Sequence, residues 1–326
     1  MKRRTLLARA PLGALSLVLP LGARAAGPYP ARPVMLIAPS GPGGGFDYVG
    51  RLMAEALTHS TGKSFYVENR TGSGTLVGTQ AAALAPADGY TLLVGGLSNL
   101  VFNSALYKTL PYNPAHDFTP VALVARYPYV LVARGGLAQN TAADIIAAAK
   151  ATPGSLTIAT AGTGTGQHVL AAAFAKAAGI ELLVVPYKSA QAAYQDLLAG
   201  RIDLFFDTLA SARPQFDTKR ARPVFLTSDR RSPTLPHTPS APEAGVPSVQ
   251  MGSWFGLFAR SGTPAPVVAE LRTRLATGLQ DAGLRTRLEA AGIERMDLDT
   301  SRTRDFIQAE YQKWTAVIRQ AGITAD

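Results

Sequence analysis

The chain has 326 residues, 47% of them apolar, and no cysteine, which excludes disulfides, thiolate metal sites and cysteine nucleophiles. Its formal net charge of +10 is inflated by residues 1–26, which carry five Lys and Arg and no acid, so 27 basic and 22 acidic residues remain after them. These charges are dispersed and form no basic run interleaved with aromatics, which argues against a nucleic-acid partner.

Residues 1–26 have the pattern of a secretory signal peptide. A basic start is followed by a short apolar stretch and by the small-residue site Ala23-Arg24-Ala25. Pro11 and Pro20 interrupt the apolar stretch, which falls short of the roughly 20 residues that a membrane-spanning helix needs. We therefore predict that the chain is exported and that residues 1–26 are removed.

Short apolar runs then alternate with amphipathic helical stretches. Residues 34–38 predict a buried strand, and Val49, Leu52, Met53 and Leu57 follow with the spacing of one apolar helix face. Further strands are predicted at 66–69, 92–94, 121–124, 129–133, 156–160, 182–185, 204–206 and 224–226. This alternation predicts an α/β protein with mainly parallel sheets flanked by helices.

A mature chain of about 300 residues exceeds what one core usually serves, which favours two domains. The strand-like runs on either side of residues 126–129 and the proline-rich stretch within 225–252 are the candidate crossings. We expect a discontinuous domain 1 formed by residues 27–126 and 249–326, and a domain 2 formed by residues 127–248. The two crossings would then form a hinge.

Two glycine-rich loops each connect a predicted strand to a predicted helix. They span residues 39–47 and 161–168. Glycines let the backbone approach a ligand, and the helix that follows offers free amides to an anion. The first loop is not a nucleotide loop, because no Gly-Lys-Ser/Thr follows and Tyr48 takes the place of the third glycine of Gly-x-Gly-x-x-Gly. One loop in each expected domain predicts a shared anion site.

Two further polar turns follow predicted strands, at residues 95–99 and at Asp207-Thr208. Asp207 could accept a hydrogen bond from an amino or hydroxyl group of a ligand. It could equally cap the helix that begins at Thr208. The sequence leaves both roles open.

No catalytic or metal-binding set is apparent in the sequence. Its histidines lack metal-ligand spacing, and no serine lies in a Gly-x-Ser-x-Gly turn. His168 begins a helix inside a glycine loop, where it could contact a ligand or be a structural histidine. We therefore predict neither a metal nor a cofactor, and no enzymatic activity.

The sequence resembles the substrate-binding receptors of tripartite tricarboxylate transporters, the Bug or TctC-like family. The matching stretches follow one another along the mature chain: residues 29–34, 42–47, 67–72, 87–93, 110–114, 117–118, 185–188, 200–204, 253–256 and 262–266. The resemblance implies a two-domain periplasmic binding protein of type II, a Venus-flytrap with a sheet flanked by helices in each domain. It implies a monomeric receptor that captures a small carboxylate, an organic acid or an amino acid, and delivers it to integral membrane permease subunits.

The resemblance also implies which residues contact the ligand. These are Ser40, Gly44, Phe46, Asp47, Ser98, Thr163, Gly164, Thr165, His168 and Asp207. The chain departs from the family pattern at Ser40, where an aromatic residue is usual, and at Phe46, where a small or hydroxylated residue is common. These exchanges suggest a more apolar or aromatic carboxylate. The alternative functions are a periplasmic sensor that presents a carboxylate to a signalling partner, and a periplasmic hydrolase.

Overall fold

The computed structural model describes residues 29–217, 219–298 and 300–324, so the predicted signal peptide lies outside it. The described strands form one ten-stranded sheet with the order β2-β1-β3-β9-β4-β7-β5-β6, in which β8 and β10 also pair with β4. The strands are β1 Val34–Ala38, β2 Phe65–Asn69, β3 Thr91–Gly96, β4 Phe118–Arg134, β5 Thr157–Thr160, β6 Leu183–Pro186, β7 Leu204–Thr208, β8 Ala221–Leu226, β9 Gly252–Arg260 and β10 Glu294–Leu298.

Ten α-helices and two short helical turns cover this sheet in the described part of the chain. They are α1 Gly45–Thr61, α2 Leu76–Ala83, η1 Ser98–Phe102, α3 Asn103–Leu106, α4 Ala142–Ala151, α5 Gly166–Ala178, α6 Ala190–Leu198, α7 Leu209–Phe216, η2 Pro247–Val249, α8 Ala265–Gly278, α9 Ala282–Ala290 and α10 Thr300–Ala321. None of the helices in these residues is both long and apolar enough to cross a bilayer.

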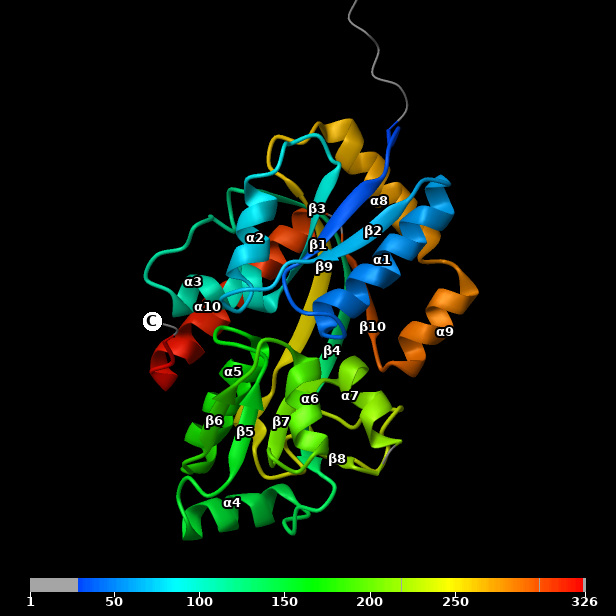
Figure 1. Cartoon of the computed structure of the whole chain (residues 1–326). Helices are drawn as coiled ribbons and strands as arrows, with labels where there is room; N and C mark the ends of the chain where they lie inside the picture. Colours follow the sequence, from blue (N-terminus) through cyan, green and yellow to red (C-terminus); the bar gives the residue numbers. More distant parts are fainter. Residues whose placement is uncertain (1–28, 218, 299, 325–326) are drawn as a thin grey trace, which may run out of the picture.

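The elements form two lobes joined by long strands (Figure 1). Lobe 1 holds β1–β3, β9, β10, α1–α3 and α8–α10, and lobe 2 holds β5–β8 and α4–α7. Pairing is parallel within β2-β1-β3 and within β7-β5-β6, as expected, but β9 and β4 between them are antiparallel to their neighbours. The sheet is therefore mixed, with its parallel parts at the outer strands.

One strand carries the chain from lobe 1 to lobe 2. The sequence predicts two strands, at 121–124 and 129–133, but the structure has the single strand β4. Its first part pairs with β9 as far as Pro128, and its last residues, from Tyr129, pair with β7 and β8. Because both parts have partners, the chain stays extended through Pro128 although proline donates no hydrogen bond.

Alternate residues of the strands pack on opposite faces of the sheet. In β4, Val130 and Val132 belong to the core under α6 and α7, whereas Leu131 belongs to the core under α4 and α5. In β1, Leu36 faces the core under α1 and α8, and Ile37 faces the opposite one. This alternation buries both faces and fixes the register of each strand.

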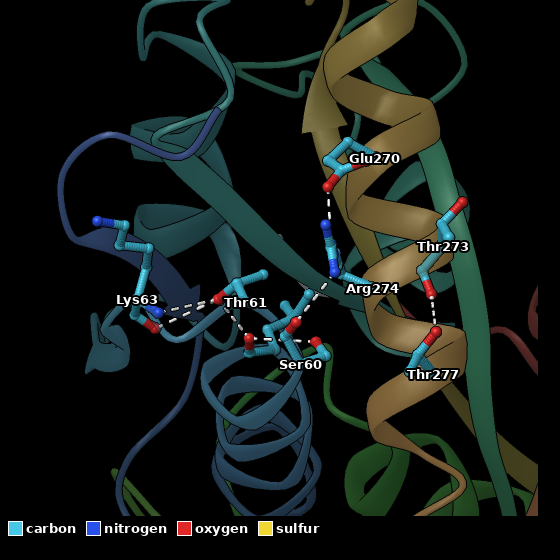
Figure 2. Close-up of polar contacts among 8 residues, drawn as sticks. Ser60, Thr61, Lys63, Glu270, Thr273, Arg274 and Thr277 are labelled. Atoms are coloured by element: carbon cyan, nitrogen blue, oxygen red, sulfur yellow. Dashed lines mark hydrogen bonds and ion pairs between the residues drawn. The ribbon is translucent and has the colours of Figure 1, made fainter. Parts of the chain in front are cut away.

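Helix α1 is anchored along α8 on the outside of lobe 1. Gly278 allows the close approach, because a Cβ there would lie 2.1 Å from the carbonyl oxygen of Ala56. Figure 2 shows Arg274 of α8 paired with Glu270 at 2.7 Å and donating to the Ser60 carbonyl at 3.2 Å. Exposed pairs like these contribute little stability, so the buried packing fixes α1.

Candidate functional site

A small cavity lies between the two lobes. Its lining residues are Ser40, Gly41, Gly44, Gly45, Phe46, Gly74, Thr75, Ser98, Tyr129, Ala161, Thr165, Gln167, Lys188, Ser189, Ala190, Thr208 and Phe255. Five of these are the N-cap residues of helices: Gly44 of α1, Thr75 of α2, Thr165 of α5, Ser189 of α6 and Thr208 of α7. Helices from both lobes thus direct their amino-terminal ends at one space.

The topology of the sheet produces this convergence. Strands β1, β2, β5, β6 and β7 are followed in the chain by α1, α2, α5, α6 and α7. Each loop leaves the carboxyl end of its strand and enters the amino end of its helix. Three antiparallel pairings lie between β3 and β7, so the two parallel parts of the sheet run in opposite directions and their carboxyl ends face each other across the cavity. Free amides and the positive ends of the helix dipoles collect there.

The lining combines polar groups with apolar surface and is nearly uncharged. Lys188 is its one charged residue, and no carboxylate contributes to it. Phe46 and Phe255 supply an aromatic wall, with ring centroids 4.9 Å apart and an interplanar angle of 85°. The site therefore offers hydrogen-bond donors and apolar surface to a ligand.

Five of the residues singled out in the sequence line this cavity: Ser40, Gly44, Phe46, Ser98 and Thr165. The Ser98 hydroxyl accepts a hydrogen bond from the Gly166 amide at 3.1 Å, which links lobe 1 to the start of α5. Thr165 caps α5, accepting from the His168 amide at 3.4 Å while it donates to the Gly162 carbonyl at 2.7 Å.

Four others in the two glycine loops lie behind the lining. Asp47 accepts from the Gly43 amide at 2.9 Å and pairs with Arg51 at 2.8 Å. The Nδ1 atom of His168 accepts from the Gly164 amide at 3.3 Å, and burial lowers the pKa of this histidine, which favours the neutral ring. These bonds hold the loops in shape.

Thr163 contributes a contact between the lobes rather than a lining side chain. A Cβ at Gly74 would lie 2.1 Å from the Thr163 carbonyl oxygen. The loop that precedes α2 and contains Gly74 therefore touches the second glycine loop through the backbone, and only glycine fits at this contact.

Asp207, the tenth, is fully buried beneath the lining. Its Oδ1 atom accepts from the Thr208 amide at 2.8 Å and from Nε2 of Gln167 at 3.2 Å, while Oδ2 has no hydrogen-bond partner. Burial raises the pKa of Asp207 to about 7, against the effect of these two bonds and of the Tyr194 hydroxyl, which all lower it. Thr208 is the N-cap of α7, so Asp207 orders the residue that precedes the helix and is not its cap.

Besides glycines and alanines, the lining holds seven residues that were not predicted to contact the ligand. They are Thr75, Tyr129, Gln167, Lys188, Ser189, Thr208 and Phe255. Ser189 follows a predicted strand and caps a helix, and Gln167 lies inside the second glycine loop, so both had a local signal. Tyr129 and Phe255 lie in strands, where no local pattern separates a cavity wall from a core. Among the described residues no group of three or more His, Asp or Glu side chains could hold a metal ion.

Known proteins share this architecture over nearly their whole length. BugT of Bordetella pertussis is 32% identical over 90% of each chain. Among solved structures, R. palustris Rpa4515 with adipate (34% identity, TM-score 0.87) covers 91% of this chain and 99% of its own, as does the periplasmic binding protein BugD (31%, 0.87). MatC from Rhodopseudomonas palustris with bound malate (30%, 0.85) covers 89% of this chain and 100% of its own.

A family model describes the same relationship. The model of the tripartite tricarboxylate transporter family receptor matches residues 49–323, which include lobe 2, most of lobe 1 and the lining residues from Gly74 onward. With this match and the shared two-lobed fold, the chain belongs to the tripartite tricarboxylate transporter receptor family, TctC, and resembles the periplasmic binding protein BugD in structure.

Proposed function

We propose that this protein captures a small carboxylate between its two lobes in the periplasm and delivers it, as a monomer, to the membrane subunits of a tripartite tricarboxylate transporter. The observation that carries the proposal is the convergence of five helix amino termini on a cavity without a lining carboxylate. Such an array is suited to a carboxylate, because free amides and helix dipoles both favour negative charge. Rpa4515 with adipate and MatC with malate support the ligand class.

The energetics allow useful affinity without a buried arginine. Each charge-assisted hydrogen bond contributes about 1.5–3 kcal/mol, and each helix end about 0.3–1 kcal/mol. Micromolar affinity requires about 8 kcal/mol. A few amide and hydroxyl donors on one carboxylate, together with the helix ends, are sufficient for that after the cost of ordering.

We assign two roles to the residues expected at the site. Ser40, Gly44, Phe46, Ser98 and Thr165 line the cavity and would contact the ligand. The others, Asp47, Thr163, Gly164, His168 and Asp207, would act by holding the loops in shape.

The lobes would move about the crossings near residues 126–129 and 225–252. Thr227 ties these crossings together: its hydroxyl accepts from the Tyr129 amide at 2.9 Å and donates to the Met251 carbonyl at 2.6 Å. Residues 27–126 and 249–326 would then move as one domain and residues 127–248 as the other.

Catalysis is not favoured by the arrangement of the site. Ser40, Ser98 and Ser189 are the serines of the lining, and no histidine or carboxylate lines the cavity beside them as a base. His168 already uses Nδ1 as an acceptor within its own loop. A nucleophile needs a base within hydrogen-bonding reach, so we propose binding without turnover.

Calorimetry with small mono-, di- and tricarboxylic acids, each paired with its neutral amide, tests the function. We expect at least one acid to bind with a dissociation constant near the micromolar range, and its amide to bind about tenfold or more weakly, since a charge-assisted bond is lost. Small-angle scattering should show compaction with the acid alone. Equal binding of acid and amide, or binding of no acid, would refute the proposal.

A further inference from the structure

Gln167 differs from the other side chains at the cavity. It lines the cavity but is only 8% exposed, so the surrounding residues hold it in place. Its Nε2 atom donates to the buried Asp207 at 3.2 Å. Its carboxamide oxygen accepts no hydrogen bond from any residue that the structure describes. The same oxygen is not fully enclosed by protein atoms. That oxygen is therefore accessible and without a partner among the described residues, on a residue that lines the cavity.

The surroundings of Asp207 fix which end of the carboxamide faces the cavity. Oδ1 of Asp207 already accepts from the Thr208 amide, so a proton on this carboxyl would sit on Oδ2. Oδ1 is thus an acceptor in either protonation state, and Gln167 has to direct its NH₂ group at it. A flipped carboxamide would place two acceptors 3.2 Å apart in a buried site.

Gln167 consequently presents a hydrogen-bond acceptor among helix ends that present hydrogen-bond donors. The helix ends around the cavity supply amide N–H groups, which suit a carboxylate and leave an acceptor on Gln167 unused. An unsatisfied buried acceptor disfavours a ligand that cannot donate to it. We propose that Gln167 is a specificity-determining residue and selects ligands with a hydroxyl group beside the carboxylate, that is, hydroxy acids over their deoxy counterparts.

Charge distinguishes a hydroxyl from an ammonium group as the donor. No carboxylate lines the cavity, and the one lining charge is the cation of Lys188. An ammonium group would be buried without a lining partner of opposite charge, which costs far more than placing a neutral hydroxyl there. Asp207 is enclosed and already receives two hydrogen bonds. Hydroxy acids therefore fit better than amino acids.

The test, which rests on the proposed carboxylate function, compares acids that differ by one hydroxyl. Calorimetry is run with malate and succinate, lactate and propionate, and citrate and tricarballylate. We expect wild type to bind the hydroxy member of the best-fitting pair about five- to tenfold more tightly. In Gln167→Met, which keeps the length but removes the acceptor, the two members should bind within about twofold. Gln195→Met, at an exposed glutamine of α6 away from the lining, should keep the wild-type ratio.

Each outcome bears either on the role of Gln167 or on the proposed carboxylate function. If wild type binds deoxy acids as tightly as hydroxy acids, or Gln167→Met keeps the preference, Gln167 does not select and the carboxylate function stands. If an amino acid binds more tightly than the matching hydroxy acid, the donor is an ammonium group and the inference is wrong. If wild type binds none of the acids, the proposed function itself fails.

Discussion

Asp207 is a carboxylic acid held where its ionised form is poorly solvated. Tyr194 of α6 and Tyr127 and Tyr129 of β4 are the titratable groups that face it, and all three are neutral at physiological pH. The Tyr194 hydroxyl lies close to Asp207, but no hydrogen bond of normal geometry reaches Asp207 Oδ2. Desolvation therefore outweighs the two bonds to Oδ1 and the contribution of Tyr194, and the pKa rises from 3.8 to about 7.

This shift predicts a pH-dependent stability that Asp207→Asn should remove. Between pH 4 and about 7 the folded chain binds a proton that the unfolded chain has released, so Asp207 lowers the free energy of unfolding as the pH rises through this window. Asn keeps an acceptor for Thr208 and Gln167 and does not titrate. In urea unfolding, the variant should match wild type near pH 4 and be about 2–4 kcal/mol more stable at pH 8. Parallel stability curves for the two proteins would show that Asp207 ionises normally.

Single residues show why the sequence predicts part of the site and not the rest. Ser40 and Thr165 line the cavity because they lie in glycine-rich loops before helices, which is a local pattern. Gln167 lies in the same kind of loop, but its role depends on Asp207, 40 positions away, which the strand order of the sheet brings beneath it. Asp207 itself looked like a ligand contact, and only the packing of α5 and α6 over it puts it behind the lining.

At the scale of elements, a helix amino terminus has two separate effects in this protein. Its cap stabilises the helix wherever the helix lies, and its free amides can also bind a ligand. Ser189 caps α6, accepting from the Ala192 amide at 3.3 Å at the cavity. Thr141 caps α4 through a reciprocal bond with Asp144, away from the lining. The two caps form a matched pair.

Replacing these caps should separate stability from binding. Ser189→Ala and Thr141→Ala should each lower the free energy of unfolding by about 1 kcal/mol, because each helix loses its side-chain cap. Only Ser189→Ala should also weaken carboxylate binding, by about two- to tenfold, since a donor at the cavity is lost. Chemical denaturation and calorimetry measure the two effects. A similar loss of affinity in Thr141→Ala would mean that binding follows general stability.

Local patterns predicted most elements because apolar periodicity and turn residues are local. The strand predicted at 34–38 is β1, and the helix predicted from the spacing of Val49 and Leu52 lies within α1. The continuity of β4 depends on partners from β9, β7 and β8, which no local pattern contains. Strand β10 also went unpredicted: its charged, short segment Glu294–Leu298 is a strand because it pairs with β4.

At the scale of the whole molecule, the lobes are in direct contact around the cavity. The Ser211 hydroxyl of lobe 2 donates to the Gly43 carbonyl of lobe 1 at 3.0 Å, and Ser98 accepts from Gly166 in the other direction. Gly41 of lobe 1 lies so near α6 that a Cβ there would be 2.6 Å from the Cβ of Ser189. The described arrangement is therefore a closed one, and closure depends on small residues at this contact.

Gly41→Ala should consequently oppose closure without harming either lobe. The three nearest atoms that its Cβ would meet all belong to Ser189 in the other lobe, so we expect the methyl group to have room once the lobes separate. We expect an unchanged melting temperature without ligand, at least a tenfold loss of carboxylate affinity, and no compaction in small-angle scattering when ligand is added. Gly136→Ala, where the nearest atom is the end of the Arg134 side chain at 3.5 Å, should behave as wild type.

Combining Gly41→Ala with Ser189→Gly removes the opposing Cβ, while a glycine cap costs only a few tenths of a kcal/mol. The double variant should therefore recover the affinity of Ser189→Gly alone. If the double variant instead loses as much binding free energy as the two single variants together, the two residues do not meet when the ligand binds. The closed form then differs from the arrangement described.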